Sequence, residues 1–205
     1  MEKTLEKAAR KKHGYDMGTV VMWLLFVLCV LVFYWTGKES SLKSTRLLNE
    51  LLHVFFRMAS IVGIIGIPSY FIGESLPRTY HPDRFPFKSW KWEKDGRVYE
   101  KLDIKERKVN AIDMSTFMRR SFPKQNTMSR DPAHMQRLVQ EMCNAEVVHG
   151  VLMLLSPVFI WLIEGWYGHF IAIGYALCNV KDIIIQRYNR PRILKIVERL
   201  QKRAH

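Results

Sequence analysis

Apolar and charged residues occupy separate blocks along this chain of 205 residues. Four blocks contain almost no charge, and the segments between them are strongly polar. Each block is close to the ~20 residues that a helix needs to cross a hydrocarbon layer of about 30 Å. The pattern predicts an all-α integral membrane protein with a single membrane domain over residues 1–205. Its four transmembrane helices are expected at residues 18–35, 51–73, 147–163 and 167–185.

The first block follows a basic segment, residues 1–17, and contains the run VVMWLLFVLCVLVFYW. A basic segment before an apolar run is also typical of a cleaved signal peptide. No small-residue cleavage site follows this run, because the bulky Phe33, Tyr34 and Trp35 stand at its end. We therefore expect an uncleaved span that anchors the chain.

The distribution of Lys and Arg gives the expected orientation. The net charge of +13 suits either nucleic acid or an anionic membrane surface, and the apolar blocks favour the membrane. We therefore expect membrane lipids and no nucleic acid as partners. Lys and Arg concentrate in residues 1–17, 74–146 and 186–205, and basic segments stay in the cytoplasm. The expected location is the cell membrane, with both termini cytoplasmic.

The polar segment at residues 74–146 is too long for a simple connection. It contains FPFKSWKWEKDGRVYEKL, in which aromatic and basic residues alternate. We expect Lys88, Trp90 and Trp92 either to lie at headgroup level on lipid phosphates or to line the entrance for an amphiphilic substrate. A tight turn is predicted at Asp95 and Gly96, between two short extended pieces.

Two helix starts are predicted further along the chain. Asp131 and Pro132 have the residue types of an N-cap and a first helical position, and this helix is expected to continue into the third span. Pro191 is expected to start a separate basic amphipathic helix after the fourth span.

Glu146 and His149 stand at the mouth of the third block, in NAEVVHG. Residues three apart share one face of a helix, and ionisable groups entering a hydrocarbon layer are costly. A Glu-x-x-His motif is also half of a di-iron site, but such sites need the motif twice. They also need further carboxylates on the facing helices, and we expect no metal.

Three stretches together resemble a known family. FPFKSWKWEKDGRVYEKL, NAEVVHG and IIIQRYNRPR, in this order and at this spacing, resemble the glycosyl-4,4'-diaponeurosporenoate acyltransferases. The resemblance implies a small membrane enzyme that esterifies a sugar hydroxyl with a fatty acyl chain. The implied acceptor is a glycosylated carotenoid-like terpenoid or another glycolipid. The implied donor is an acyl thioester, either acyl-CoA or acyl-carrier protein, with no bound cofactor.

This reaction needs a base near the hydroxyl and donors for the oxyanion. We expect His149 to be the base, because the ordinary pKa of histidine lies near neutrality, and Glu146 to hold its imidazole. The residues expected to bind substrate are Lys88, Trp90, Trp92, Asn144, Arg187, Tyr188, Asn189, Arg190 and Arg192.

Two alternatives remain open at this point. Glu146 and His149 can be a buried pair that only locks helices together. The whole protein can also be a non-enzymatic scaffold or accessory subunit that binds anionic lipid through its basic face. The sequence does not indicate an oligomeric state.

Overall fold

A computed structural model describes residues 17–39, 47–102 and 131–204 of the chain. Part of the predicted cytoplasmic segments, including residues 1–16, lies outside the described residues. The described residues contain no β-strand. They form the helices α2 (Met17–Glu39), α3 (Leu47–Ser75), α5 (Pro132–Leu154), α6 (Val158–Leu162) and α7 (Trp166–Ala204), and the 3₁₀ turns η1 (Lys91–Glu93) and η2 (Arg97–Leu102).

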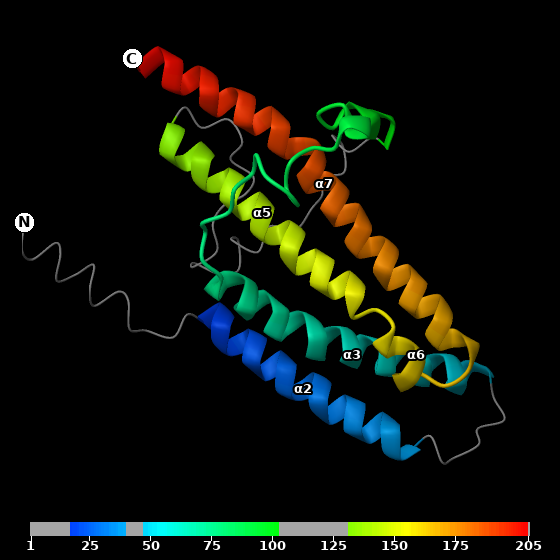
Figure 1. Ribbon diagram of the computed structural model, residues 1–205. Helices are drawn as coiled ribbons and strands as arrows, with labels where there is room; N and C mark the ends of the chain where they lie inside the picture. Colours follow the sequence, from blue (N-terminus) through cyan, green and yellow to red (C-terminus); the bar gives the residue numbers. More distant parts are fainter. Residues whose placement is uncertain (1–16, 40–46, 103–130, 205) are drawn as a thin grey trace, which may run out of the picture.

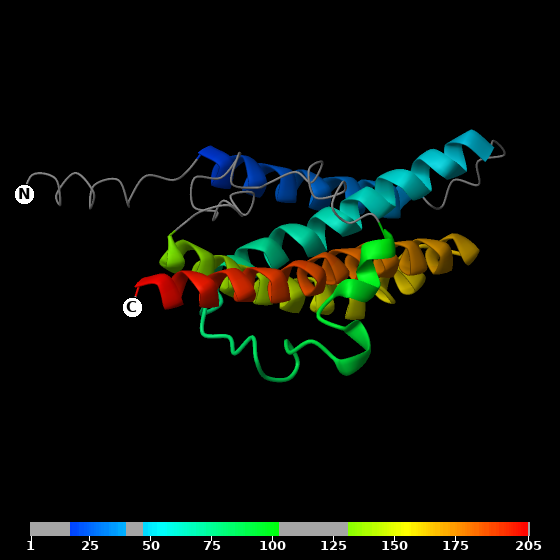
Figure 2. The same ribbon diagram turned by 90° about the horizontal axis from the view of Figure 1, so that it is seen from above.

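The long helices run roughly along one direction and form two antiparallel pairs (Figures 1 and 2). Helix α2 pairs with α3, and α5 returns through the short α6 into α7. Contacts between α3 and α5 join the two pairs. The segment at residues 76–102, here called the strap, leaves α3 and lies against the α5–α7 pair on the side away from α2 (Figure 2).

The prediction of four spans is confirmed, and the protein is a multi-pass membrane protein. Four segments among the described residues are long and apolar enough to cross a membrane: Met17–Gly37, Asn49–Ser75, Pro132–Leu162 and Trp166–Lys202. The first is apolar on all sides and leaves most of its side chains exposed in the isolated chain, as expected for a helix that faces lipid. It packs on α3 closely, because a Cβ added at Gly63 would collide with the sulfur of Cys29.

The predicted start of the third helix is confirmed. The Asp131 carboxylate accepts a hydrogen bond from the Ala133 amide at 3.0 Å, and Pro132 is the first helical residue. Helix α5 then continues through Glu146 and His149 into the apolar block, as expected. Its first half packs on the last third of α7 through the buried residues Met135, Leu138, Val139, Met142, Ile193 and Val197.

The predicted separate helix at Pro191 is wrong. Helix α7 continues through Pro191 to Ala204. A proline inside a helix leaves one carbonyl, four residues earlier, without its N–H partner. Here that carbonyl belongs to Arg187. Tyr188, which follows Arg187, and Arg190, which precedes Pro191, are both buried by tertiary contacts. The packing around this turn therefore holds the helix together where local sequence favours a break.

The strap also differs from the prediction in one respect. Its two pieces are 3₁₀ turns rather than extended segments. The predicted turn between them is present, with positive φ at Lys94, Asp95 and Gly96. A Cβ at Gly96 would lie 3.1 Å from the backbone of Tyr188, so glycine allows the strap to approach α7 closely.

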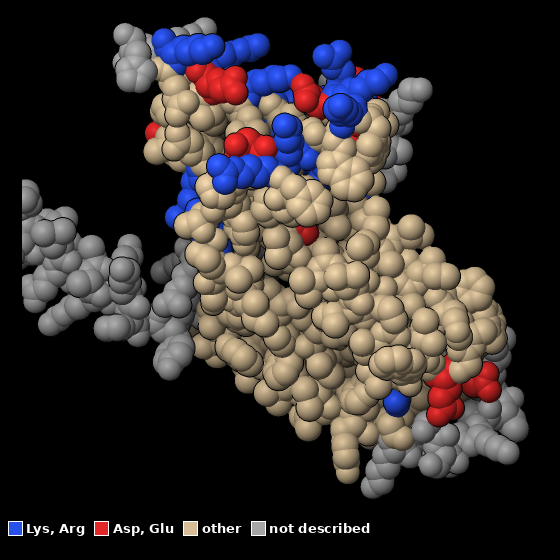
Figure 3. Space-filling model, in the orientation of Figure 1, with Lys and Arg blue, Asp and Glu red and all other residues tan. Residues whose placement is uncertain are grey.

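Charge is concentrated at one end of the bundle (Figure 3). Helices α2 and α5 begin there, α3 and α7 end there, and the strap lies there (Figure 1). We call this the basic end. The belt below it is almost free of charge, and a few charged residues reappear at the opposite end (Figure 3).

Candidate active site

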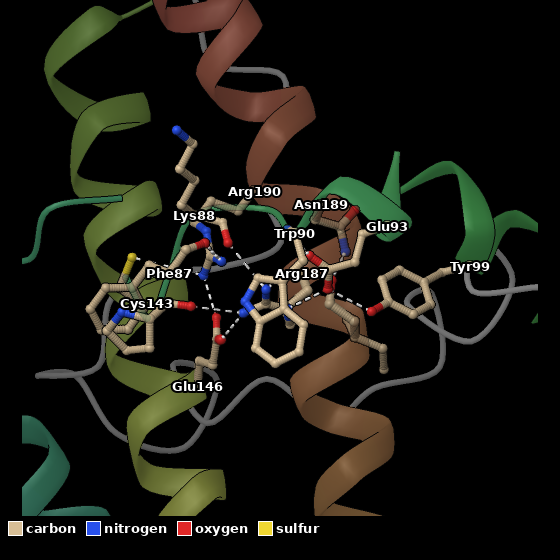
Figure 4. A network of polar contacts seen from close by, with 12 residues as sticks. Phe87, Lys88, Trp90, Glu93, Tyr99, Cys143, Glu146, Arg187, Asn189 and Arg190 are labelled. Atoms are coloured by element: carbon tan, nitrogen blue, oxygen red, sulfur yellow. Dashed lines mark hydrogen bonds and ion pairs between the residues drawn. The ribbon is translucent and has the colours of Figure 1, made fainter. Parts of the chain in front are cut away.

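A buried ion-pair network joins α5, α7 and the strap at the basic end (Figure 4). Its centre is Glu146 on α5, whose two carboxylate oxygens each pair with an arginine of α7. Arg187 Nη1 donates to Oε1 at 2.6 Å, and Arg190 Nη1 donates to Oε2. The Arg190 residue is only 1% exposed. The two cations are therefore neutralised in a region shielded from water.

A second carboxylate, that of Glu93 in the strap, binds Arg187 from the other side. Arg187 Nε and Nη2 donate to its two oxygens at 2.5 Å and 2.8 Å, which is a bidentate pair. Glu93 also accepts from the Tyr99 hydroxyl at 2.6 Å and from the Trp90 amide at 2.6 Å. The strap thus contributes a buried anion that completes the charge balance of the network: two arginines and two glutamates.

These contacts shift the acidity of the strap residues. Burial by itself favours the neutral form of Glu93, but the hydrogen bonds from Arg187, Tyr99 and the backbone outweigh it. The pKa of Glu93 therefore lies below its ordinary value. Burial and then the hydrogen bond to Glu93 raise the pKa of Tyr99, so its hydroxyl remains a neutral donor.

The arginines also hold the strap by its backbone. Arg187 donates to the carbonyls of Pro86 at 3.1 Å and Lys88 at 3.2 Å, and Arg190 donates to the carbonyl of Phe87. A guanidinium has five N–H donors, and those of Arg187 are all used in these contacts. No donor of Arg187 is left for a substrate, so its contacts assign it to fixing the strap.

Aromatic side chains of the strap cover the network. The guanidinium of Arg187 lies 5.5 Å from the Trp90 ring, and that of Arg190 lies 5.6 Å from the Phe87 ring. Trp90 and Trp92 remain half-exposed and contact each other edge to face. The Lys88 side chain points away from the network (Figure 4).

His149 lies one helical turn further into the apolar belt. Its Nδ1 is 3.0 Å from Oδ1 of Asn179 and 3.8 Å from Oδ2 of Asp182, both on α7. The Asn179 amide nitrogen donates to the Tyr175 carbonyl at 2.9 Å, which fixes Oδ1 as the atom facing the imidazole. Nδ1 therefore carries the proton in the neutral ring, and Nε2 is left with its lone pair.

The predicted contact between Glu146 and His149 is wrong. Among the described residues, Glu146 pairs with the two arginines and His149 with residues of α7. Both side chains lie on the same side of α5, but two guanidinium groups bind a carboxylate more strongly than one imidazole does. The imidazole instead contacts Asn179 at 3.0 Å, with the Asp182 carboxylate 3.8 Å away.

Sequence reasoning missed Asn179 and Asp182. A signal was present, because Asn179 and Asp182 lie three apart within the mostly apolar fourth span, as Glu146 and His149 do in the third. Polar pairs at matching depth in two spans favour contact between them.

The other predicted substrate residues are not gathered around His149. Asn144 uses both ends of its amide, donating to the Gly73 carbonyl and accepting from the Tyr80 hydroxyl, each at 3.0 Å. Asn189 donates to its own helix, at the Ile185 carbonyl. Arg192 pairs with Glu100 at 2.7 Å and stacks on the buried Tyr188 at 3.6 Å.

A second buried carboxylate lies on α5 nearer its start. Glu141 accepts from Arg78 Nε at 3.1 Å and from Arg137 at 3.3 Å. Arg78 also donates to the Gly73, Glu74 and Leu76 carbonyls, which closes the end of α3. This cluster fixes the first residues of the strap. Among the described residues, no group of three or more His, Cys, Asp and Glu side chains can hold a metal ion.

Comparison with known proteins places the Glu146 network and His149 in one matched region. The family model described as glycosyl-4,4'-diaponeurosporenoate acyltransferase matches residues 82–199, which include the strap from Pro82, α5, α6 and most of α7. The protein of that name from Staphylococcus aureus strain N315 is 28% identical over 136 residues, covering 65% of this chain and 81% of its own length. The protein from strain bovine RF122 / ET3-1 is 29% identical over the same extents. No solved structure matches the chain.

Proposed function

The chain belongs to the glycosyl-4,4'-diaponeurosporenoate acyltransferase family, and we propose that it moves a fatty acyl chain onto a sugar hydroxyl of a lipid-linked glycoside. The family decides between the enzyme and the non-enzymatic scaffold: the protein is an acyltransferase. The names of its relatives support a glycosylated carotenoid-type acceptor. The donor that fits this chemistry is an acyl thioester, carried by CoA or by acyl-carrier protein.

The observation that carries the proposed mechanism is the orientation of His149. Its side chain is 28% exposed, and its Nδ1 is occupied by Asn179, so Nε2 is available to accept a proton. In this mechanism Nε2 takes the proton of the sugar hydroxyl while the hydroxyl oxygen attacks the thioester carbonyl carbon. The new C–O bond forms, the C–S bond breaks, and the imidazolium returns the proton to the departing thiolate.

The arrangement of the basic end supports a location for this reaction. We propose that the basic end faces the cytoplasm, where thioester donors are made, and that both termini lie on that side of the cell membrane. The half-exposed Trp90 and Trp92 suit the headgroup level, and the exposed Lys88 suits a lipid phosphate. His149, one turn deeper than the buried network, is then within reach of an acceptor whose lipid part lies in the membrane.

Replacing His149 by alanine tests the mechanism. We expect the purified variant to lose acyl transfer by at least about 100-fold, because general-base catalysis contributes typically 10²- to 10⁴-fold. The measurement is turnover per mole of monodisperse, detergent-purified protein with a labelled acyl thioester and a glycolipid extract. The matched control is His169→Ala, which removes an exposed histidine at the opposite end of α7.

A fall in activity counts only if the protein is still folded. His149→Gln provides that check, because glutamine keeps a hydrogen-bond donor near Asn179 but cannot act as a base. We expect it to match the wild type in melting temperature and to match His149→Ala in lost turnover. Near-normal turnover in either His149 variant would overturn the assignment.

A further inference from the structure

Three polar side chains from two helices meet where the spans enter the apolar belt. His149 comes from α5, and Asn179 and Asp182 come from one face of α7. Asn179 is 5% exposed, yet both ends of its amide are satisfied, by the imidazole and by the Tyr175 carbonyl. A buried amide held in this way offers its oxygen to the ring in one fixed direction.

Asp182 is the full negative charge next to this ring. Its Oδ2 lies 3.8 Å from His149 Nδ1, and its Oδ1 lies 3.7 Å from the exposed Lys181 ammonium. Glu146, on the same helix as His149, is already neutralised by Arg187 and Arg190. Asp182 is therefore the anion placed to interact with the ring when it is protonated.

Helix α3 also packs against this part of α5, through a close contact at the backbone of a glycine. Gly73 of α3 lies against Val148 and Asn144, so a Cβ at Gly73 would meet Val148 at 2.8 Å. This contact fixes the rotation of α5 and, with it, the direction of the neighbouring His149.

We propose that Asn179 and Asp182 are positioning residues for the acyl transfer: Asn179 fixes the Nδ1–H tautomer of His149, and Asp182 stabilises the imidazolium that forms. This inference rests on His149 being the base. When Nε2 accepts the hydroxyl proton, the ring becomes positive beside Asp182. The ring becomes neutral again when it gives the proton to the thiolate. In this proposal both residues act through the ring and not on the reacting atoms.

Two substitutions of opposite electrostatic sign test the proposal. Asp182→Asn removes the negative charge, so the protonated ring is less favoured and the acidic limb of the pH–rate profile moves to lower pH. Asn179→Asp adds a negative charge at 3.0 Å from Nδ1, so the limb moves to higher pH. We expect shifts of about 1 pH unit in each direction, as for a unit charge near 4 Å in a partly solvated site. Turnover should fall about 10-fold in Asp182→Asn with an unchanged KM.

The controls separate a positioning role from a structural one. Glu198→Gln removes an exposed carboxylate from the same helix and should leave the profile unchanged. Asp182→Glu keeps the charge and should recover most of the turnover. A merely structural role would change yield and melting temperature without opposite shifts of the profile.

The outcomes distinguish this inference from the proposed function. An inactive His149→Ala with unshifted profiles in both Asp182→Asn and Asn179→Asp would overturn the positioning roles and leave His149 as the base. An active His149→Ala would overturn both. Opposite shifts, together with an inactive His149→Ala, are the expected result.

Discussion

The two ends of the bundle contain arginines that are stabilised in different ways. At the basic end, Arg187 and Arg190 pair with the carboxylates of Glu146 and Glu93. At the opposite end, Arg57 of α3 has a backbone partner: its Nε donates to the Leu162 carbonyl at 2.5 Å. Its guanidinium also lies 4.9 Å from the ring of Phe33 on α2.

The arginines have different partners because they stabilise different structures at the two ends. Leu162 is the last residue of the short α6, and the free carbonyls at a helix C-terminus carry a partial negative charge. Arg57 binds one of them and connects α2, α3 and α6. His53 makes the same kind of contact, with Nε2 2.7 Å from the Thr36 carbonyl near the end of α2.

The basic end has to hold an irregular segment against two helices. The strap supplies few backbone hydrogen bonds of its own, so its carbonyls and Glu93 are bound by the arginines of α7. Two full positive charges then need two full negative charges. Ion pairs that join α5, α7 and the strap hold the strap beside the candidate active site. The contacts at the opposite end only satisfy carbonyls at helix ends.

The largest expected effect concerns the sides on which the two ends lie. We expect a cysteine at Lys94, in the strap, and one at Glu164, between α6 and α7, to be labelled from opposite sides of the membrane. Glu164→Cys should react with an impermeant maleimide in intact cells, and Lys94→Cys only after permeabilisation. The background is Cys178→Ser, because Cys178 is the exposed native thiol among the described residues. Labelling of both positions from one side would contradict the assignment of the two ends.

The next effect compares the two ends in stability. Glu146→Ala leaves two buried arginines without their shared anion, and breaking a buried ion pair typically costs about 3–5 kcal/mol. Arg57→Ala removes a hydrogen bond to a carbonyl and a ring contact, for which we expect roughly 2 kcal/mol. Thermal unfolding in detergent, followed by size-exclusion chromatography, measures both. Glu198→Ala is the exposed control. Equal losses in the two variants would show that the Glu146 carboxylate contributes no more stability than the contact of Arg57 with a helix end.

The smallest effect concerns pH. The pKa of Glu93 lies below the ordinary value of 4.5, so its charged form contributes stability that is complete above about pH 4.5. That contribution is lost as the pH falls from 4.5 through the lowered pKa. Glu93→Gln removes the charge at every pH and should cost roughly 1–2 kcal/mol at neutral pH.

The difference between wild type and Glu93→Gln is the quantity to measure. Their melting temperatures should converge as the pH falls below 4.5, because the other carboxylates titrate in both proteins and cancel. A difference that stays constant with pH would mean that the charge of Glu93 does not stabilise the strap.

The candidate site was only partly accessible to sequence reasoning. Arg187 and Arg190 were expected among the substrate-binding residues, and the periodicity of a helix placed Glu146 and His149 on one face of α5. It could not tell which of these groups pair, because that depends on the rotation of α7 against α5. Arg187 and Arg190 meet Glu146, and Asn179 and Asp182 meet His149, only in one rotational setting.

The sequence alone determined the features that depend on neighbours along the chain. These are the four spans, the helix start at Asp131, the turn at Gly96 and the concentration of positive charge at one end, since each depends on local hydropathy, capping or backbone conformation. The tertiary structure decided what depends on distant partners. Tertiary packing keeps α7 helical through Pro191 and holds the strap in 3₁₀ turns. It also pairs Glu146 with the two arginines and His149 with Asn179. Contacts between residues thirty or more positions apart are set by helix packing, which local sequence does not encode.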